Sequence, residues 1–381
     1  MFDPYMVSVI AFFAAIAVLI FLKRKKVKQE HYILFMYRTK RFSKIIDRIA
    51  GISPRFWKIF STVGVVLCFC VMVFGTAMLF KTSWAIGTGL IKKPAFALVL
   101  PSISSDGSAG PGYILIPFWF WLITIFSILV PHELCHGIIS RAHKIRLKSV
   151  GLLLLGIFPG AFVEPDEKQL EREKILPRLR VFAAGSYANF CTAIAIILLL
   201  NFIIWPAFTE PGIMLTEVNE TSPAWMAGLK PGMMITEING KTVSTTYFEN
   251  IMGKGYLADE TGETNIGDVI KAEADGKIYE VELAEHPETK KPYMGIFYKP
   301  LIKHSYIFGV MISLLGMIWA LSFAVGVVNI LPLYPLDGGL MVNALARKFF
   351  KKNSKKIVKI VSIATLILIL FNFLGPYLMR I

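Results

Sequence analysis

Charged residues and cysteines are scarce in this sequence. Only 18% of the 381 residues are charged, whereas 55% are hydrophobic. A composition so poor in charge excludes an ordinary soluble globular protein. The chain has four cysteines, and all of them fall inside apolar runs. The hydrophilic segments therefore offer no basis for a disulfide framework, which excludes a small secreted fold held together by disulfides.

Acidic residues are also few, with 26 Asp and Glu against 41 Lys and Arg and a net charge of +15. The basic residues cluster directly after apolar runs, as in residues 23–28 and 141–148, rather than on one hydrophilic domain. This distribution is typical of residues that set the topology of a membrane protein. We therefore expect no nucleic-acid partner, since a domain that binds nucleic acid carries its basic residues on its own surface.

Apolar runs long enough to cross a bilayer recur along the chain. A run of about 18 or more apolar residues predicts a spanning helix. Six such segments are expected, at residues 6–22, 57–80, 113–141, 181–205, 305–328 and 357–374. The basic residues that follow some of these runs place the N-terminus outside the cytoplasm and residues 81–112 in an external loop. The sequence thus predicts a polytopic α-helical membrane protein with about six transmembrane helices.

Residues 150–163 depart from this pattern, because they are apolar but too short to span a bilayer. The segment is interrupted by Pro159 and by three glycines. Irregular backbone at membrane depth is tolerated where protein or a cavity satisfies it, so we expect a re-entrant hairpin with its turn near residues 158–160. Such a hairpin presents a free strand edge to an extended substrate, or it is a buried loop that only seals a site.

Residues 207–300 are mixed polar and apolar and contain no long apolar run, which predicts a soluble insertion of domain size. We expect a strand at 212–218, a short helix capped by Ser222, a strand at 233–238 and a tight turn at Asn239-Gly240. This order resembles the PDZ domains inserted in bacterial and archaeal proteases. The resemblance implies an α+β domain that captures a peptide C-terminus as an added strand near residues 212–215. The alternative is a small β-rich domain that only blocks access.

The third predicted span contains the motif His132-Glu133-Leu134-Cys135-His136. On a helix, residues four apart lie on one face, so His132 and His136 are placed to bind one Zn²⁺, and Glu133 beside them is placed to act as a general base. Ionisable residues at membrane depth are costly and indicate a functional site. The alternative is a polar helix end at the interface with two solvated histidines. Cys135 is close enough to approach a metal, although a small apolar residue of a membrane helix explains it more simply.

A catalytic zinc site needs a third protein ligand, and three residues are candidates. His143 misses the spacing of the extended metalloprotease motif by one residue, and Glu164 follows the predicted hairpin. Asp337 is favoured, because two prolines precede it within residues 329–336 and Gly338-Gly339 follow it at the cytoplasmic end of a span, where we expect irregular backbone. A helix N-cap is the alternative role for Asp337. Asn189 in the fourth span is either a helix-packing residue or a residue that hydrogen-bonds to a substrate or an oxyanion.

The combination of His132-Glu133-x-x-His136 on a membrane helix, Asn189 on the next, an inserted PDZ-like domain and Leu336-Asp337-Gly338 resembles the site-2 protease family of intramembrane zinc metalloproteases. The resemblance implies one Zn²⁺ per chain, held by His132, His136 and Asp337, with Glu133 as the base that activates the nucleophilic water and Asn189 as a substrate-positioning residue. It implies regulated intramembrane proteolysis, in which peptide bonds within or near transmembrane segments of membrane proteins are hydrolysed. The alternative function is a membrane metal-ion transporter or scaffold without proteolysis.

Four segments follow from this interpretation. They are residues 1–112 (N-terminal transmembrane helices, a basic cytoplasmic segment and an external loop), 113–206 (first part of the catalytic membrane core), 207–300 (the PDZ-like domain) and 301–381 (second part of the core and the C-terminal helix). We expect a multi-pass membrane protein with its active site in the bilayer toward the cytoplasm and the PDZ-like domain outside the cytoplasm. The expected partners are the lipid bilayer, membrane-protein substrates and a peptide C-terminus.

Overall fold

The computed structural model describes residues 3–23, 27–31, 34–156, 158–243, 248 and 264–379. The chain divides into two compact units. The first, which we call the membrane unit, comprises Met1–Ile197 and Leu314–Ile381, and the second, the insert unit, comprises Leu198–Ser313. The predicted insertion at residues 207–300 lies within the insert unit.

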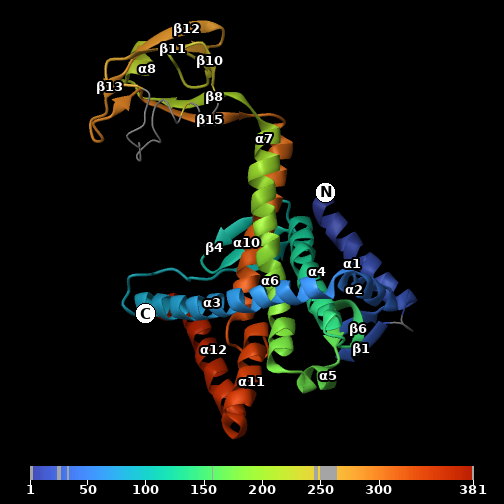
Figure 1. Ribbon diagram of the computed structural model, residues 1–381. Coiled ribbons are helices and arrows are strands. Elements are labelled where there is room, and N and C mark those ends of the chain that lie inside the picture. The colour runs from blue at the N-terminus through green and yellow to red at the C-terminus, as the bar shows by residue number, and fades with distance from the viewer. Residues whose placement is uncertain are drawn as a thin grey trace. The chain divides into compact units, whose positions relative to one another are not determined.

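Among the described residues, six helices are long and apolar enough to cross a membrane (Figure 1). They are α1 (Pro4–Leu22), α3 (Pro54–Gly87), α4 (Phe118–Ala142), α6 (Ile175–Leu199) with its extension to Phe208, α10 (Ser305–Ile330) and α12 (Ser354–Leu378) with the turn before it. The prediction of a polytopic helical membrane protein is confirmed. The number of helices follows from composition alone, because each run is apolar over a bilayer's thickness.

The predicted start of the third span is wrong. The run at residues 113–141 begins as a strand, β5 (Tyr113–Pro117), and α4 starts only at Phe118. β5 pairs in parallel with β3 (Leu98–Ser102) and antiparallel with β4 (Ser108–Gly110). Much of the expected loop at 81–112 is therefore ordered, with α3 extending through its first residues. A run that is apolar throughout has no periodicity to separate strand from helix.

The fourth span also begins earlier than expected. α6 starts at Ile175, so Arg178 and Arg180 lie within the helix, although their charge suggested a segment outside the membrane. Arg180 donates two hydrogen bonds to the hydroxyl of Thr62 on α3, and Arg178 lines a cavity. Both side chains are therefore turned toward protein or a cavity, which is where charged residues of membrane helices are tolerated.

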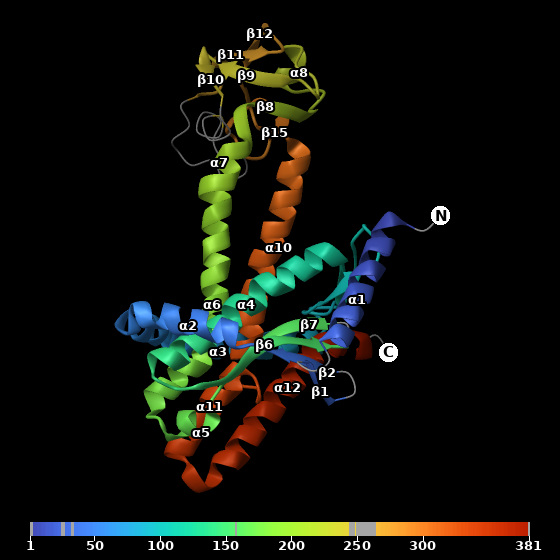
Figure 2. The same cartoon turned by 90° about the vertical axis from the view of Figure 1, so that its right-hand side faces the viewer.

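A four-stranded antiparallel sheet lies against α4 (Figure 2). Its order is β1 (Val27–His31), β2 (Leu34–Arg38), β6 (Leu147–Leu155) and β7 (Phe158–Pro165). The hairpin expected at 150–163 is present as β6 and β7, but its turn includes Gly156 with φ of 60°, and residues 158–160 belong to β7. The turn thus directly precedes Phe158, close to the predicted residues, and it contains Gly156, which readily adopts positive φ.

Helix α2 (Lys40–Ile52) packs on the same helix as the sheet does. Ile46 and Ala50 are buried against Ile138 of α4. Gly137 permits this contact, since a Cβ at that position would lie 2.9 Å from a methyl of Ile46. The α4 helix is thus held on one side by α2 and on another by β7, at the level of its histidines.

The insert unit is built on an antiparallel sheet of order β12-β11-β9-β8-β15, with β10 beside β9. Its main elements are β8 (Thr209–Val218), α8 (Pro223–Met226), β9 (Met234–Ile238), β10 (Lys241–Thr242), β11 (Val269–Ala274), β12 (Lys277–Glu282) and β15 (Ile296–Ile302). Short strands β13 (Ala284–Glu285) and β14 (Pro292–Tyr293) form a separate pair, and η1 (Leu200–Ile204) and α7 (Trp205–Phe208) precede β8. Buried aliphatic side chains fill one core.

The local predictions for the insert unit are confirmed. The Ser222 hydroxyl accepts from the Trp225 N–H at the start of α8, and Asn239 and Gly240 have φ of 51° and 74° in the turn between β9 and β10. A sheet-rich portion therefore exists where a soluble insertion was expected. Residues 213–214 of β8 pair with β9 on one side and with β15 on the other, and the expected capture of a peptide end near residues 212–215 stays a prediction. A strand with two partners offers no edge for a third.

Candidate metal centre

Helix α4 brings two imidazoles together. His132 and His136 follow each other by one helical turn, and their Nε2 atoms are 3.3 Å apart. Both rings lie among packed helices, and only 6% of the His132 surface is exposed. The spacing in the sequence is sufficient to explain the pair, because a regular helix permits no other arrangement of these two side chains than neighbours on one face.

Asp337 comes from an element about two hundred residues later. It is the first residue of α11 (Asp337–Phe349), with Leu336 at the N-cap position, so the expectation of irregular backbone at Asp337 is wrong. Gly338 makes this helix start possible, because a Cβ there would overlap the backbone carbonyls of Ile330 and Leu331. A helix N-terminus also stabilises a carboxylate through its unpaired N–H groups and dipole.

The three side chains meet around one point. The Asp337 carboxylate lies 3.6 Å from His132 Nε2 through Oδ2 and 3.4 Å from His136 Nε2 through Oδ1. Atoms bound to a tetrahedral zinc ion at about 2.0–2.2 Å are themselves about 3.3–3.6 Å apart. The observed separations of 3.3, 3.4 and 3.6 Å are of that size, with a different oxygen of Asp337 nearest to each histidine. Gly185 of α6 faces this point, and a Cβ on it would overlap Nε2 of both histidines. The donor atoms and the space left by Gly185 both fit a bound metal.

Outer contacts to two of these side chains come from α6. His136 Nδ1 is 2.7 Å from the Val181 carbonyl, so Nδ1–H donates and the lone pair of Nε2 is left to face the other candidate ligands. The Ser186 hydroxyl donates to Asp337 Oδ2 at 2.9 Å. These bonds fix the orientation of an imidazole and a carboxylate before any ion is present.

Asn189 makes the corresponding contact to the third side chain. Its carboxamide Nδ2 lies 3.1 Å from His132 Nδ1, and its Oδ1 is buried without a hydrogen-bond partner among the described residues. A half-turn of the carboxamide places Oδ1 on Nδ1–H, which gives Oδ1 a partner and leaves the Nε2 lone pair for a metal. Asn189 is fully buried, so its contact in this structure is with His132. The role in substrate positioning stays a prediction.

Glu133 lies on the open side of the cluster. Its Oε2 accepts a hydrogen bond from the Val163 N–H of β7 at 2.9 Å. Glu133, both histidines and Asp337 line one cavity of about 790 Å³ in the membrane unit. The carboxylate is thus held at a fixed place beside the candidate metal site, where a small molecule in the cavity can reach it.

The other candidates for a third ligand lie elsewhere. Glu164 accepts from the Ser149 hydroxyl at 2.7 Å and pairs with Lys148. His143 caps the C-terminus of α4, where burial and the nearby cations Arg180 and Lys58 lower its pKa to about 4. Neither joins the group of ligand atoms that lie within 4.8 Å of one another, which comprises His132, His136 and Asp337 among the described residues.

Cys135 does not join the group either. Its side chain packs in an apolar cluster with Ile139 and Val181, as expected for a small apolar residue of a membrane helix.

Sequence reasoning missed the contribution of α6 apart from Asn189. Val181, Gly185 and Asn189 are spaced by four residues and Ser186 follows Gly185, which places all four on adjoining faces of one helix. That spacing is visible in the sequence. The carbonyl of Val181 and the missing side chain of Gly185 carry no chemical signal of their own, so only the packed structure shows what they do.

Comparison with known proteins agrees with this geometry. The model of peptidase family M50 matches residues 120–371, well over half of the chain and including every residue of the cluster. An uncharacterized protein of Methanocaldococcus jannaschii is 27% identical over 329 residues, which cover 85% of this chain and 80% of that protein. A membrane-bound transcription factor site-2 protease homolog of Arabidopsis thaliana is 28% identical over 116 residues, 30% of this chain and 21% of that protein. This chain belongs to peptidase family M50, the site-2 protease family of membrane-embedded zinc metalloproteases.

Proposed function

We propose that this protein hydrolyses peptide bonds within or near the transmembrane segments of membrane-protein substrates, in the manner of regulated intramembrane proteolysis. The observation that carries the proposal is the triangle of His132, His136 and Asp337 with Glu133 beside it on the wall of one cavity. A metal-transport or scaffold site needs the three ligands but has no use for a carboxylate held next to them.

The roles of the residues follow from their contacts. His132, His136 and Asp337 would hold Zn²⁺, which supplies a Lewis acid that polarises the scissile carbonyl and lowers the pKa of water. Glu133 is anchored through Oε2 by the Val163 N–H, which leaves Oε1 to accept the proton of the attacking water. The same atom then delivers that proton to the leaving nitrogen. The outer contacts from α6 keep the ligands oriented throughout.

Strand β7 is placed to bind the substrate as an extended chain. It is the edge strand of its sheet, and the Val163 N–H points away from β6 toward Glu133. Val150 is opposite Val163, and its carbonyl accepts from Thr39 on the other side, so this pair exchanges no hydrogen bonds. Two residues along, Ala161 has the same orientation and directs its N–H and C=O to the open edge. A substrate helix that unwinds there presents its backbone next to Glu133.

Replacing Ala161 with Pro is expected to lower kcat/KM for a single-span substrate by about tenfold, because one backbone donor is removed from the edge. Proline is tolerated on an edge strand where its missing N–H faces outward, and Pro159 and Pro165 already stand at equivalent positions of β7. Ala161→Val keeps the N–H and is the matched control. Equal cleavage by the two variants at equal zinc content would show that the substrate does not pair with β7.

We further propose that the active site opens toward the cytoplasm and that the insert unit lies on the opposite side and restricts which substrates enter. The basic residues after α1 and α4 support this orientation through the positive-inside rule. β8 begins and β15 ends as neighbours, with Thr209 opposite Ile302, so residues 210–301 are removable with a short Gly linker.

This deletion is expected to permit cleavage of substrates that still carry a bulky folded domain outside the membrane. The reason is that a sheet-rich unit with no free edge at residues 213–214 acts by size rather than by capture. The measurement compares deleted and full-length protein on trimmed and untrimmed forms of one substrate. Loss of cleavage of the trimmed form alone would instead support capture of a peptide end.

The test of the proposed function is cleavage of a single-span substrate by the purified full-length protein in detergent. We expect one zinc ion per chain, cleavage within or next to the spanning segment, loss of cleavage on chelation and recovery on adding zinc. If the protein holds one zinc ion but cuts none of a varied set of membrane-spanning substrates, the proposal is overturned. The transporter or scaffold hypothesis is then favoured.

A further inference from the structure

The cavity that contains Glu133 extends away from the candidate metal site along α11. Asp337, Leu340, Asn343 and Arg347 all line it, and their spacing of three, three and four residues places them on one face of that helix. Arg347 follows Asp337 by ten residues, which is about 15 Å along a helix axis. The guanidinium of Arg347 therefore belongs to the end of the cavity farthest from the metal site.

Helix α6 brings a second arginine to the same end. Arg178 and Phe182 line the cavity, and together with Gly185 they are spaced by four and three residues on one face. Gly185 faces both histidines, and Arg178 precedes it by seven residues, or about 10 Å of helix. Two helices that contribute to the metal site thus each carry an arginine to the far end of one cavity.

Glu171 is a carboxylate close to both arginines. Arg347 Nη1 is 2.7 Å from Glu171 Oε1, on the short helix α5 (Glu167–Arg172). Arg178 interacts electrostatically with both Arg347 and Glu171. Its Nε is buried and has no hydrogen-bond partner in the part of the chain that the structure describes. A buried donor without an acceptor is costly, and a guanidinium is shaped to bind a carboxylate through two parallel bonds.

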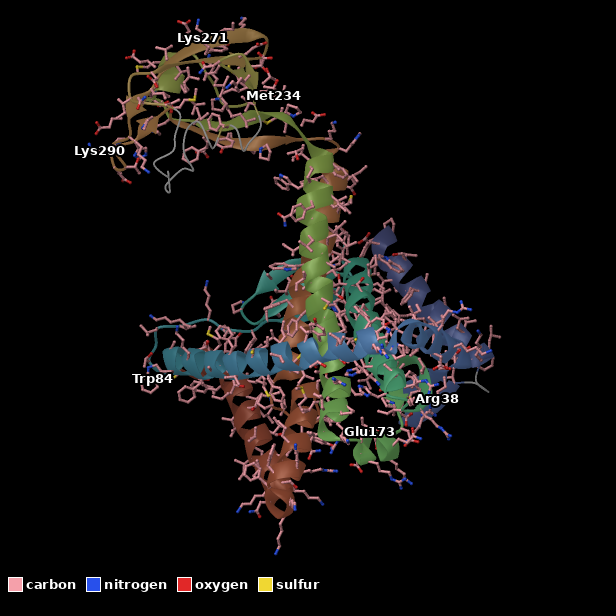
Figure 3. The ribbon with its side chains drawn as sticks, in the orientation of Figure 1. Arg38, Trp84, Glu173, Met234, Lys271 and Lys290 are labelled. Carbon is pink, nitrogen blue, oxygen red and sulfur yellow. The ribbon has the colours of Figure 1, made fainter. Side chains whose placement is uncertain are left out.

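The cavity wall carries five carboxylates, Glu133, Glu164, Glu167, Glu171 and Asp337, against three arginines, so the wall as a whole has no excess of positive charge. Glu164 is engaged by Ser149 and Lys148, and Glu167 stands one turn before Glu171 on α5. Arg38, at the end of β2, adds a further positive charge to the wall (Figure 3). At this end of the cavity, Arg178 Nε is the buried donor that an additional carboxylate would find.

We infer that Arg178 and Arg347 form a subsite for a carboxylate of the substrate, with Glu171 holding Arg347 while the subsite is empty. The inference rests on the proposed function, since it places this carboxylate relative to the scissile bond. An extended chain advances about 3.3 Å per residue, so 10–15 Å corresponds to three to five residues from that bond. The carboxylate is an Asp or Glu side chain, or the C-terminus of a substrate that ends there.

The experiment scans one acidic residue through a single-span substrate that the full-length protein cuts in detergent. Asp and Asn are compared at each position from two to six residues on either side of the scissile bond. We expect Asp to be preferred by about tenfold in kcat/KM at one position, three to five residues away, mainly through a lower KM. Substrates that end at that position, as free acid or as amide, distinguish a terminal carboxylate from a side chain.

Variants of the protein are expected to shift this preference in opposite directions. Arg178→Gln and Arg347→Gln each reduce the Asp preference, because each removes half of the subsite. Glu171→Gln increases it, because Arg347 loses its internal partner. The matched controls are Lys348→Gln, on α11 but off the cavity wall, and Glu173→Gln, just after α5 (Glu173 is labelled in Figure 3). Both should leave the preference unchanged.

Equal cleavage of Asp and Asn substrates at every position, or an Asp preference that survives in the double variant Arg178→Gln, Arg347→Gln, would overturn the inference. Retained zinc content and retained cleavage of the Asn substrates show that a variant is folded. Failure of the proposed function gives a different result, because the wild type would then cut no member of the panel.

Discussion

Replacing Glu133 with Gln is expected to abolish cleavage while the protein keeps one zinc ion per chain. The change removes the atom that accepts the water proton but preserves size, and it leaves His132, His136 and Asp337 unaltered. A positioned general base contributes about 10²–10⁴ in rate, so kcat for a single-span substrate should fall by about 10³. The measurements are steady-state cleavage and zinc content on the same preparations.

The matched control for this change is Glu164→Gln. Glu164 lines the same cavity as Glu133 and lies on β7, but it pairs with Ser149 and Lys148 and lies outside the ligand cluster. We expect it to cut at a rate close to that of the wild type. A Glu133→Gln variant that holds zinc and cuts as fast as the wild type would show that another group, or none, moves the proton.

Local geometry explains which parts of the site were accessible from the sequence. A helix alone brings His132 and His136 to one face, and Glu133 is next to His132 in the chain. The motif therefore predicts this part of the site wherever a helix can be predicted with confidence. Asp337 is separated from them by about two hundred residues and was favoured because a carboxylate at membrane depth demands an explanation. The sequence did not predict that Asp337 begins a helix. The prolines before it suggested irregular backbone at Asp337, whereas in the structure the irregular backbone ends at Leu336.

The strands were harder to foresee than the helices. In a soluble protein, alternation of polar and apolar residues separates a strand from a helix, but residues 98–101, 113–117 and 150–155 are apolar on both faces. Pairing also joins distant segments, with Leu34 opposite Leu155. The turn at Asn239-Gly240 and the cap at Ser222 were predicted correctly. Both lie in the insert unit, whose strands have one side toward a core and the other toward solvent.

The arginines of α6 illustrate a related limit. Arg178 and Arg180 look like the flank of a membrane span, because charge normally ends an apolar run. The helix nevertheless continues through them, since each side chain reaches a cavity or a hydroxyl instead of lipid. A sequence shows that a residue is charged, whereas only packing shows which face of the helix it occupies and whether that face borders a site.

Replacing Gly185 with Ala is expected to abolish zinc binding and proteolytic activity together. A Cβ at this position would overlap Nε2 of both His132 and His136, in the space that a metal bound to them would occupy. The helix itself tolerates Ala better than Gly, so any loss arises at the site and not from helix propensity. Changes to residues that only orient metal ligands already weaken binding by about 10–100-fold, and a methyl group among the ligand atoms should cost at least as much.

The measurement is zinc content and zinc affinity, with cleavage as a second readout that should fall in parallel. Gly75→Ala is the matched control, because it also adds a methyl group to a buried glycine of a membrane helix but meets only methyl groups at ordinary contact distance, of Leu331 at 3.4 Å and Val327 at 3.7 Å. It should keep its zinc. Full zinc content in Gly185→Ala would contradict the site, since two histidines that bind metal through Nε2 at this position leave no room for the added carbon. If the expected loss is observed, zinc binding depends on Gly185, which has no side chain, as directly as on His132, His136 and Asp337.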